Sequence, residues 1–117
     1  IKELIVETFN GKRINILAPV IRSRKGHYRE LFEQIAKQGF LKVRVNGQIR
    51  DLEFGMKVDR YKTHDIEIVI DRMAIDETED TDKRLTESIR TAMYHGDDIL
   101  MVIADSEEDF EKVSERL

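Results

Sequence analysis

The sequence predicts an α+β domain, with an antiparallel sheet of about five strands and two or three helices packed on it. Two kinds of pattern support this prediction. Some stretches alternate apolar and polar residues, as strands do, and others repeat apolar residues three and four positions apart, as helices do. The two patterns do not alternate regularly along the chain, which favours α+β over a parallel sheet wound with helices. The length of 117 residues fits a single domain over 1–117.

Helix and strand patterns follow one another from the start of the chain. Residues 1–9 have helical spacing and end at an Asn-Gly pair, and 13–20 alternate as a strand does. Pro19 is expected to close that strand, because proline cannot donate a hydrogen bond to a ladder. A basic loop over 22–25 then opens a helix over 27–38.

A hairpin is the strongest short-range signal in the sequence. Asn46 and Gly47 both tolerate positive φ, the conformation that a two-residue hairpin turn requires. The strand before the turn, 40–46, has apolar residues on one face and cations on the other: Leu41, Val43 and Val45 against Lys42 and Arg44. The return strand is expected over 48–52.

A second charged strand follows a loop over 53–63. Residues 64–73 alternate, with isoleucines on one face and Glu67 and Asp71 on the other. If this strand pairs with 40–46, the result is a flat charged sheet face with cross-strand ion pairs. Exposed ion pairs contribute only ~0–1 kcal/mol each, so such a face suits recognition better than stability. A face that merely keeps the domain soluble is the open alternative.

The C-terminal part of the chain predicts a helix and a buried strand. After an acidic loop, Thr81 or Asp82 can cap a helix that runs to Tyr94. The apolar run 98–104 is typical of a buried strand. Over 106–117 a capping-box pattern and helical spacing predict a further helix, and a frayed segment would give much the same pattern.

Charged residues make up 38% of the chain, against about 25% in an average domain. Their distribution is uneven: residues 1–62 hold 14 Lys and Arg against 7 Asp and Glu, and residues 63–117 hold 6 against 17. A basic half and an acidic half fit a protein that docks against charged partners. The two halves could equally pair with each other in the fold, and the sequence leaves both interpretations open.

No pattern in the sequence demands an enzyme. Glycine-rich phosphate-binding motifs, the paired-histidine zinc motif and the serine-hydrolase motif are absent, and the histidines are scattered singly: His27, His64 and His95. The chain has no cysteine, which excludes a disulfide framework and a cysteine zinc site. We therefore expect no catalytic, cofactor-binding or metal-binding residue. Without a signal pattern or an apolar run of about 20 residues, the expected location is the cytoplasm, with no membrane contact.

Arg22, Arg24 and Lys25 form one candidate binding cluster. They are expected at the N-terminus of the 27–38 helix, where the helix dipole favours anions. A phosphate or a partner's carboxylate would fit there, and a plain solvated turn would have the same sequence. Direct DNA contact through the basic N-terminal half is the weaker alternative function, because aromatic residues are few and the net charge is −4.

Four segments, in order, carry a resemblance to a known family. Residues 17–28 are similar to the stretch LAPVxRGRKGEY, and 39–47 to GFVRVRVDG. Residues 64–72 are similar to HxIEVVVDR, and 84–89 match RLxxSIE in part. These stretches belong to the UvrA family, the damage-recognising ATPases of bacterial nucleotide excision repair. The likeness covers nearly the whole chain.

The resemblance implies that the chain is the UvrB-binding domain inserted in the first ATPase module of a UvrA protein. A chain that starts at Ile1 rather than Met fits a fragment of that kind. Two family arginines implicated in docking UvrB correspond to Lys42 and Arg72. We therefore expect Lys42, Arg44 and Arg72 to bind UvrB, with Asp71 orienting Arg72.

The resemblance also implies properties of the parent protein. The parent is expected to act as a dimer on damaged duplex DNA and to hold ATP, magnesium and zinc outside this segment. The chain departs from the family pattern at Lys42 for Arg, Ser23 for Gly, Asn46 for Asp and Thr63 for Lys. The first departure concerns docking, because lysine lacks the planar fork that grips a carboxylate with two hydrogen bonds.

Overall fold

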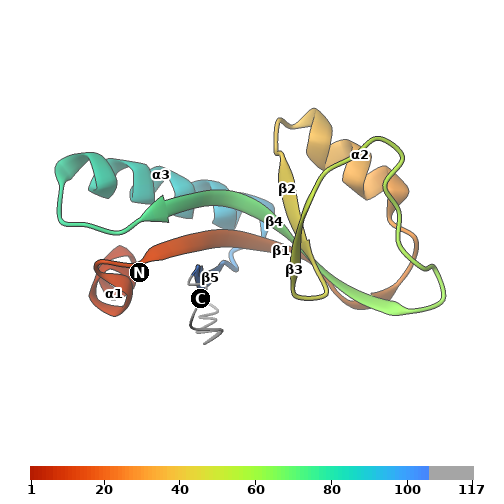
Figure 1. The fold of residues 1–117 in the computed structure, drawn as a ribbon, viewed down its shortest axis with the longest axis horizontal. Helices are drawn as coiled ribbons and strands as arrows, with labels where there is room; N and C mark the ends of the chain where they lie inside the picture. The colour runs from red at the N-terminus through yellow and green to blue at the C-terminus, as the bar shows by residue number, and fades with distance from the viewer. Residues whose placement is uncertain (106–117) are drawn as a thin grey trace. The chain divides into compact units, whose positions relative to one another are not determined.

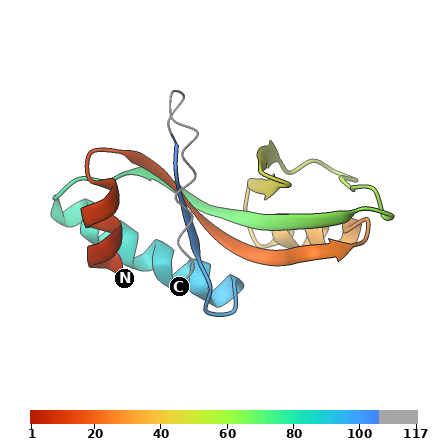
Figure 2. The ribbon, with the colours of Figure 1, turned by 90° about the horizontal axis from the view of Figure 1, so that it is seen from below.

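The computed structural model describes residues 1–105, which form two compact units. The first unit contains Ile1–Ala18 and the chain from Ile70 onward, and the second unit is Pro19–Val69. Two long strands, β1 (Arg13–Lys25) and β4 (Thr63–Ala74), contribute residues to both units (Figure 1, Figure 2). Each unit has a hydrophobic core of its own.

The five strands of the described chain belong to one sheet, in the order β3-β2-β4-β1-β5 (Figure 1). β2 (Lys42–Val45) pairs antiparallel with both β3 (Gln48–Asp51) and β4. β5 (Met101–Ala104) pairs antiparallel with β1. Together with the three helices of the described chain, this arrangement confirms the predicted α+β class.

In the first unit, helices α1 (Lys2–Phe9) and α3 (Glu79–His95) lie against each other. An ion pair joins them, with Lys2 Nζ 2.9 Å from Asp82 Oδ1. Both helices and the strands of this unit contribute fully buried side chains to one core: Ile5, Phe9, Ile14, Ile16, Leu17, Leu85, Ala92, Leu100 and Val102. Burial of each large aliphatic or aromatic side chain stabilises the unit by about 1.5–3 kcal/mol before chain entropy is subtracted.

In the second unit, helix α2 (Arg29–Lys37) buries its apolar face and the strands bury theirs. The core residues of this unit are Phe32, Ile35, Val43, Val45, Met56, Ile66, Ile68 and Val69. The predicted hairpin is confirmed, because Asn46 and Gly47 have φ of 50° and 85° and Val45 stands opposite Gln48. The strand expected over 40–46 begins only at Lys42, so Leu41 precedes β2 and, unlike Val43 and Val45, is exposed.

β1 is longer than the sequence predicts, because it continues through Pro19 to Lys25. Asn15 and Leu17 stand opposite residues of β5, and the carbonyl of Arg13 accepts from Asp105 N–H. Bonded residues alternate along an antiparallel strand, so Pro19 is the next residue whose nitrogen faces the β5 side. The pairing with β5 stops at Leu17, and the missing N–H of proline therefore costs no ladder bond.

α3 begins earlier than the sequence predicts. Its N-cap is Thr78, whose Oγ1 accepts a hydrogen bond from Thr81 N–H at 3.3 Å. Thr81 and Asp82, the expected caps, are therefore residues of the first turn, where acidic side chains complement the helix dipole. The further helix expected over 106–117 lies outside the residues that the structure describes.

Candidate functional site

Lys42 and Arg44, the predicted docking cations of the second unit, occupy alternate positions of β2. Lys42 stands opposite Asp51 of β3, and their side chains form an ion pair. The side chain of Lys42 is 37% exposed and that of Asp51 is 71% exposed. Because water and salt screen such a pair, Asp51 holds Lys42 only weakly, and Lys42 remains accessible to a partner.

Arg44 is held more firmly than Lys42. It stands opposite Glu67 of β4, with Arg44 Nη1 2.6 Å from Glu67 Oε1, so the predicted cross-strand pair is present. The two side chains are only 11% and 4% exposed, however, and the expectation of a flat exposed charged face is wrong at this pair. Burial raises the pKa of Glu67, and the hydrogen bond and charge of Arg44 offset part of that rise. Arg44 therefore neutralises a carboxylate inside the protein.

Asp71 lies on the part of β4 that belongs to the first unit, and α3 supplies its partners. Arg84 donates from Nε and Nη2 to the two carboxylate oxygens, at 2.9 and 2.6 Å, and Ser88 Oγ donates at 2.8 Å. Burial alone would raise the pKa of Asp71, but these hydrogen bonds outweigh it and hold the pKa below its usual value. The residue that Asp71 orients is Arg84, not Arg72 as expected.

Arg72 forms an ion pair with Asp105, and its side chain is 40% exposed. Like Lys42 in the second unit, it combines an accessible cation with one acidic partner. The four predicted docking residues are thus divided between the units, two in each. Within each unit one residue is accessible, Lys42 or Arg72, and the other is committed to internal contacts.

Arg22, Arg24 and Lys25 lie exposed near the end of β1, in the second unit. Their expected position at a helix N-terminus is wrong, because the strand continues to Lys25 and α2 begins only at Arg29. None of the three forms an ion pair within residues 1–105. They remain candidate contacts for an anionic partner, without the help of a helix dipole.

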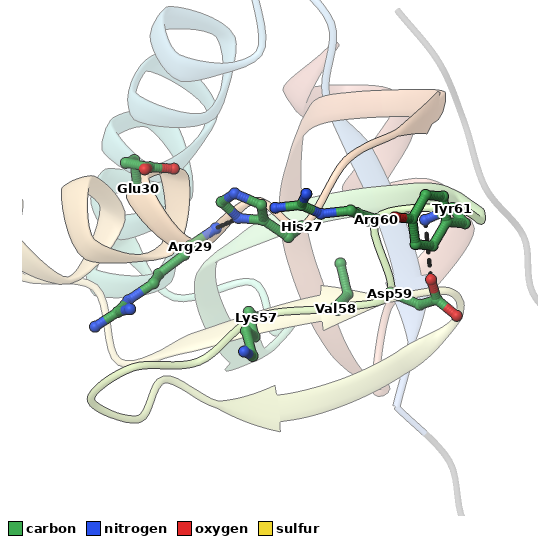
Figure 3. Close-up of a pocket in the computed structure, with 8 residues that line it drawn as sticks. All are labelled: His27, Arg29, Glu30, Lys57, Val58, Asp59, Arg60 and Tyr61. Carbon is green, nitrogen blue, oxygen red and sulfur yellow. Dashed lines mark hydrogen bonds between the residues drawn. The ribbon is translucent and has the colours of Figure 1, made fainter.

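The second unit also contains a cavity of about 580 Å³, between the start of α2 and the loop that precedes β4 (Figure 3). The polar side chains of its lining are those of His27, Arg29, Glu30, Lys57, Asp59, Arg60 and Tyr61. Lys57 and Arg60 form no ion pair within the described chain, and Arg29 has only a surface contact with Glu33, at 3.5 Å. The cavity is therefore open and polar, and its three cations outnumber its two carboxylates, Glu30 and Asp59.

A family model described as the UvrA interaction domain matches residues 1–106. The chain belongs to this family. This match confirms the resemblance that the ordered segments of the sequence carry.

Among similar proteins of known name are three UvrABC system proteins A. That of Methanothermobacter thermautotrophicus is 41% identical over 102 residues, which are 87% of this chain and 11% of the relative. The Pseudomonas putida protein is 38% identical over 100 residues (86% and 10%), and the Thermus thermophilus protein is 41% identical over 95 residues (80% and 10%). The chain spans about a tenth of the length of these relatives.

Within residues 1–105, this UvrA interaction domain has no group of three or more His, Asp or Glu side chains placed to hold a metal ion. Nor is any helix in that range long and apolar enough to cross a membrane.

The cavity and several exposed apolar side chains of this UvrA interaction domain were not predicted from the sequence. Phe54 is 99% exposed and Leu41 and Tyr61 are each 78% exposed, all three in the second unit. Phe54, Lys57, Arg60 and Tyr61 fall in the loop 53–63, which has no hydrophobic period. The one signal in the sequence was an aromatic residue in a stretch without hydrophobic periodicity. Such a stretch does not indicate which helix or strand it packs beside.

Proposed function

We propose that this UvrA interaction domain is a docking module without catalytic activity of its own, and that it binds UvrB during nucleotide excision repair. Its parent would be a UvrA protein, which recognises DNA damage and hydrolyses ATP through other domains. The family membership supports the proposal that the parent is a UvrA protein. The accessible cations support the proposal that docking uses charged contacts. The observation that carries the proposal is the contrast between Lys42 and Arg72, which are accessible, and Arg44, which is buried.

In the exposed ion pairs of Lys42 and Arg72, a carboxylate of a binding partner can replace the carboxylate of the domain. Each cation is held by one partly exposed carboxylate, Asp51 or Asp105, in a pair that stabilises the fold by ~0–1 kcal/mol. A carboxylate on UvrB can replace that partner at small cost, and complementary charge would speed encounter and fix the register. Lys42 would make this contact as a point charge, because it has no guanidinium fork.

The test is the affinity of UvrB for a Lys42→Ala/Arg72→Ala double variant, measured by isothermal titration calorimetry. We expect binding to weaken about tenfold or more, equivalent to ~1.4 kcal/mol, with no change in melting temperature. A Lys12→Ala/Arg90→Ala variant is the matched control, since it removes one lysine and one arginine that are exposed and unpaired in the described chain. Equal affinities for the double variant, the control and the unmodified domain would refute docking through these two cations.

A second candidate function is direct contact with duplex DNA in the assembled complex. The observation that favours it is the exposure of three cations along β1 that form no ion pair within residues 1–105, namely Arg22, Arg24 and Lys25. Replacing all three with Gln should then weaken duplex binding and flatten its salt dependence by about 0.9 per lost phosphate contact. Fluorescence anisotropy with a labelled duplex would measure both effects, and an unchanged salt slope would exclude this function.

A further inference from the structure

We propose that the cavity beside α2 binds a single-stranded nucleic acid, with Lys57 and Arg60 on its phosphates and Tyr61 stacked on a base. This site includes neither Lys42 nor Arg72, the cations proposed to contact UvrB, and it does not include the basic end of β1. It is built from the start of α2 and from the loop that leads to β4, both in the second unit (Figure 3).

The charges of the cavity select an anion. Arg29, Lys57 and Arg60 contribute three positive charges, against Glu30 and Asp59. In Figure 3 the carboxylate of Glu30 lies well apart from Lys57 and Arg60. The carboxylate of Asp59 accepts the N–H of Tyr61 at 2.9 Å. Neither acidic group therefore pairs with Lys57 or Arg60.

The loop that presents these cations is fixed before any ligand arrives. Val58 N–H donates to the carbonyl of His27 at 2.9 Å. The carbonyl of Asp59 lies 2.7 Å from Nε2 of His64, a buried residue. Because Val58 and Asp59 stand between Lys57 and Arg60, both cations lie on an ordered backbone, and little loop entropy is lost on binding.

His27 adds a hydrogen-bond donor to the cavity. Its Nδ1 accepts the N–H of Arg29 at 3.1 Å, so the proton of the neutral ring lies on Nε2. Nε2–H can donate to a phosphate oxygen, and the guanidinium of Arg60 and the ammonium of Lys57 can do so at other points of the cavity. Each of these groups is a donor, as a phosphate requires.

The spread of the cations favours a strand over a single phosphate ion. In Figure 3 the guanidinium of Arg29, the ammonium of Lys57 and the guanidinium of Arg60 lie apart from one another around the cavity. Separated cations match successive phosphates of a backbone. Tyr61 lies beyond Arg60 and is 78% exposed, so its ring is free to stack on a base. Stacking of this kind needs an unpaired base, which a duplex does not offer.

The first test is a fluorescence-anisotropy titration of a labelled oligothymidine of about 15 nucleotides with the 117-residue chain at low salt. A Lys57→Gln/Arg60→Gln variant should bind at least tenfold more weakly, and the slope of log affinity against log salt should flatten by about 1.4, or ~0.7 per lost phosphate contact. A Lys37→Gln/Arg90→Gln variant makes the same charge change at exposed, unpaired cations outside the cavity and should lose less than about twofold if local contacts dominate. Equal losses for the two variants would overturn the proposal, as would an unmodified chain that does not bind the oligonucleotide.

The second test addresses the base. Tyr61→Ala should weaken binding of the oligothymidine by about fivefold or more, whereas Tyr61→Phe, which keeps the ring, should bind as the unmodified chain does. A labelled duplex of the same length should bind more weakly and should not respond to Tyr61→Ala. Tighter binding of the duplex, or no effect of Tyr61→Ala on the single strand, would overturn the assignment.

The third test separates nucleic acid from an acidic protein partner. The Lys57→Gln/Arg60→Gln variant should bind UvrB with unchanged affinity in calorimetry. Polyglutamate at the same concentration of negative charge should displace the oligothymidine poorly. Loss of UvrB binding in this variant, or efficient displacement by polyglutamate, would show that the cavity recognises protein carboxylates, and the proposal would be wrong.

Discussion

Arg44 and Glu67 form a buried ion pair in which each side chain is the other's one ion-pair partner within the described chain. We expect Arg44→Met to lower the free energy of unfolding by about 3 kcal/mol at pH 8, because it removes the hydrogen-bonded counter-charge of a buried carboxylate and leaves only the weaker attraction of Arg22. An Arg44→Met/Glu67→Leu variant should recover most of this loss, since both charges are then absent. Urea denaturation of the two variants measures the difference.

The pH dependence of the Arg44→Met variant gives a second check on the same pair. Burial already raises the pKa of Glu67, and without Arg44 the pKa should rise further. A carboxyl group with a raised folded-state pKa favours folding at low pH, and this benefit is lost as the pH rises through that pKa. The loss caused by Arg44→Met should therefore be smaller at pH 5 than at pH 8. A loss below about 1 kcal/mol at both pH values would show that the pair is solvated.

Asp71 should make the stability of the first unit depend on pH in the opposite sense. Burial would raise the pKa of Asp71, but the hydrogen bonds from Arg84 and Ser88 lower it. The contribution of Asp71 to stability is therefore complete above its unfolded-state pKa of about 3.9. As the pH falls through the lower folded-state pKa, the contribution disappears. The free energy of unfolding of the unmodified chain should therefore exceed that of Asp71→Asn by about 2 kcal/mol at pH 7 and by much less near pH 2. Urea titrations across this pH range measure the difference.

Glu87→Gln is the control for that measurement, because Glu87 is an exposed carboxylate on the same helix, α3. It should differ little from the unmodified chain at either pH. A difference between the unmodified chain and Asp71→Asn that stays constant from pH 7 to pH 2 would contradict the role given to Arg84 and Ser88.

At the residue scale, strand alternation could predict which side chains share a face but not which of them are buried. It placed Arg44 and Glu67 on the charged faces of their strands, and the register of β2 with β4 brings the two side chains together. Their burial depends on segments that are distant in the sequence, and alternation carries no information about those. Ser23 is a further case: it lies within β1 with a φ of 51°, a conformation that favours glycine, and strand alternation does not indicate it.

At the element scale, the start of α3 distinguishes two capping residues. Thr78 accepts the N–H of Thr81 through its side chain, so Thr78→Ala should cost about 1 kcal/mol of unfolding free energy. Thr81→Ala should cost clearly less, because Thr81 lies inside the first turn and alanine favours helix. Thermal unfolding followed by circular dichroism measures both variants. A larger loss for Thr81→Ala would restore the cap that the sequence predicts.

Elements were predicted best where their signals were local. The Asn46-Gly47 turn needs only two residues with positive φ, and the hairpin was predicted with its register. The length of β1 was not, because Pro19 ends a strand only where a neighbour needs its N–H. That neighbour, β5, lies far along the chain and pairs only as far as Leu17. The cavity was not predicted for a similar reason. It lies between α2 and a loop that has no hydrophobic periodicity, and the two are distant in the sequence.

At the scale of the whole molecule, the chain offers distinct charged surfaces rather than a catalytic centre. Acidic and basic residues do pair in the fold, as at Lys2 with Asp82 and Arg44 with Glu67, and this accounts for part of the charge surplus. Cations at Lys42 and Arg72 remain accessible beside weakly held partners, and those at Lys57 and Arg60 have no ion pair within residues 1–105. The docking proposal explains the accessible charge of Lys42 and Arg72, and the nucleic-acid proposal explains that of Lys57 and Arg60.

The most direct test of the docking proposal is a calorimetric titration of the unmodified chain with purified UvrB at 50 and 300 mM salt. We predict saturable binding with one UvrB per chain, and a markedly weaker affinity at the higher salt, because the contacts are exposed charge pairs with a Debye length of about 10 Å near 0.1 M. Absence of binding at low salt would contradict the docking function itself. Binding of equal affinity at both salt concentrations would contradict the charged contacts of Lys42 and Arg72.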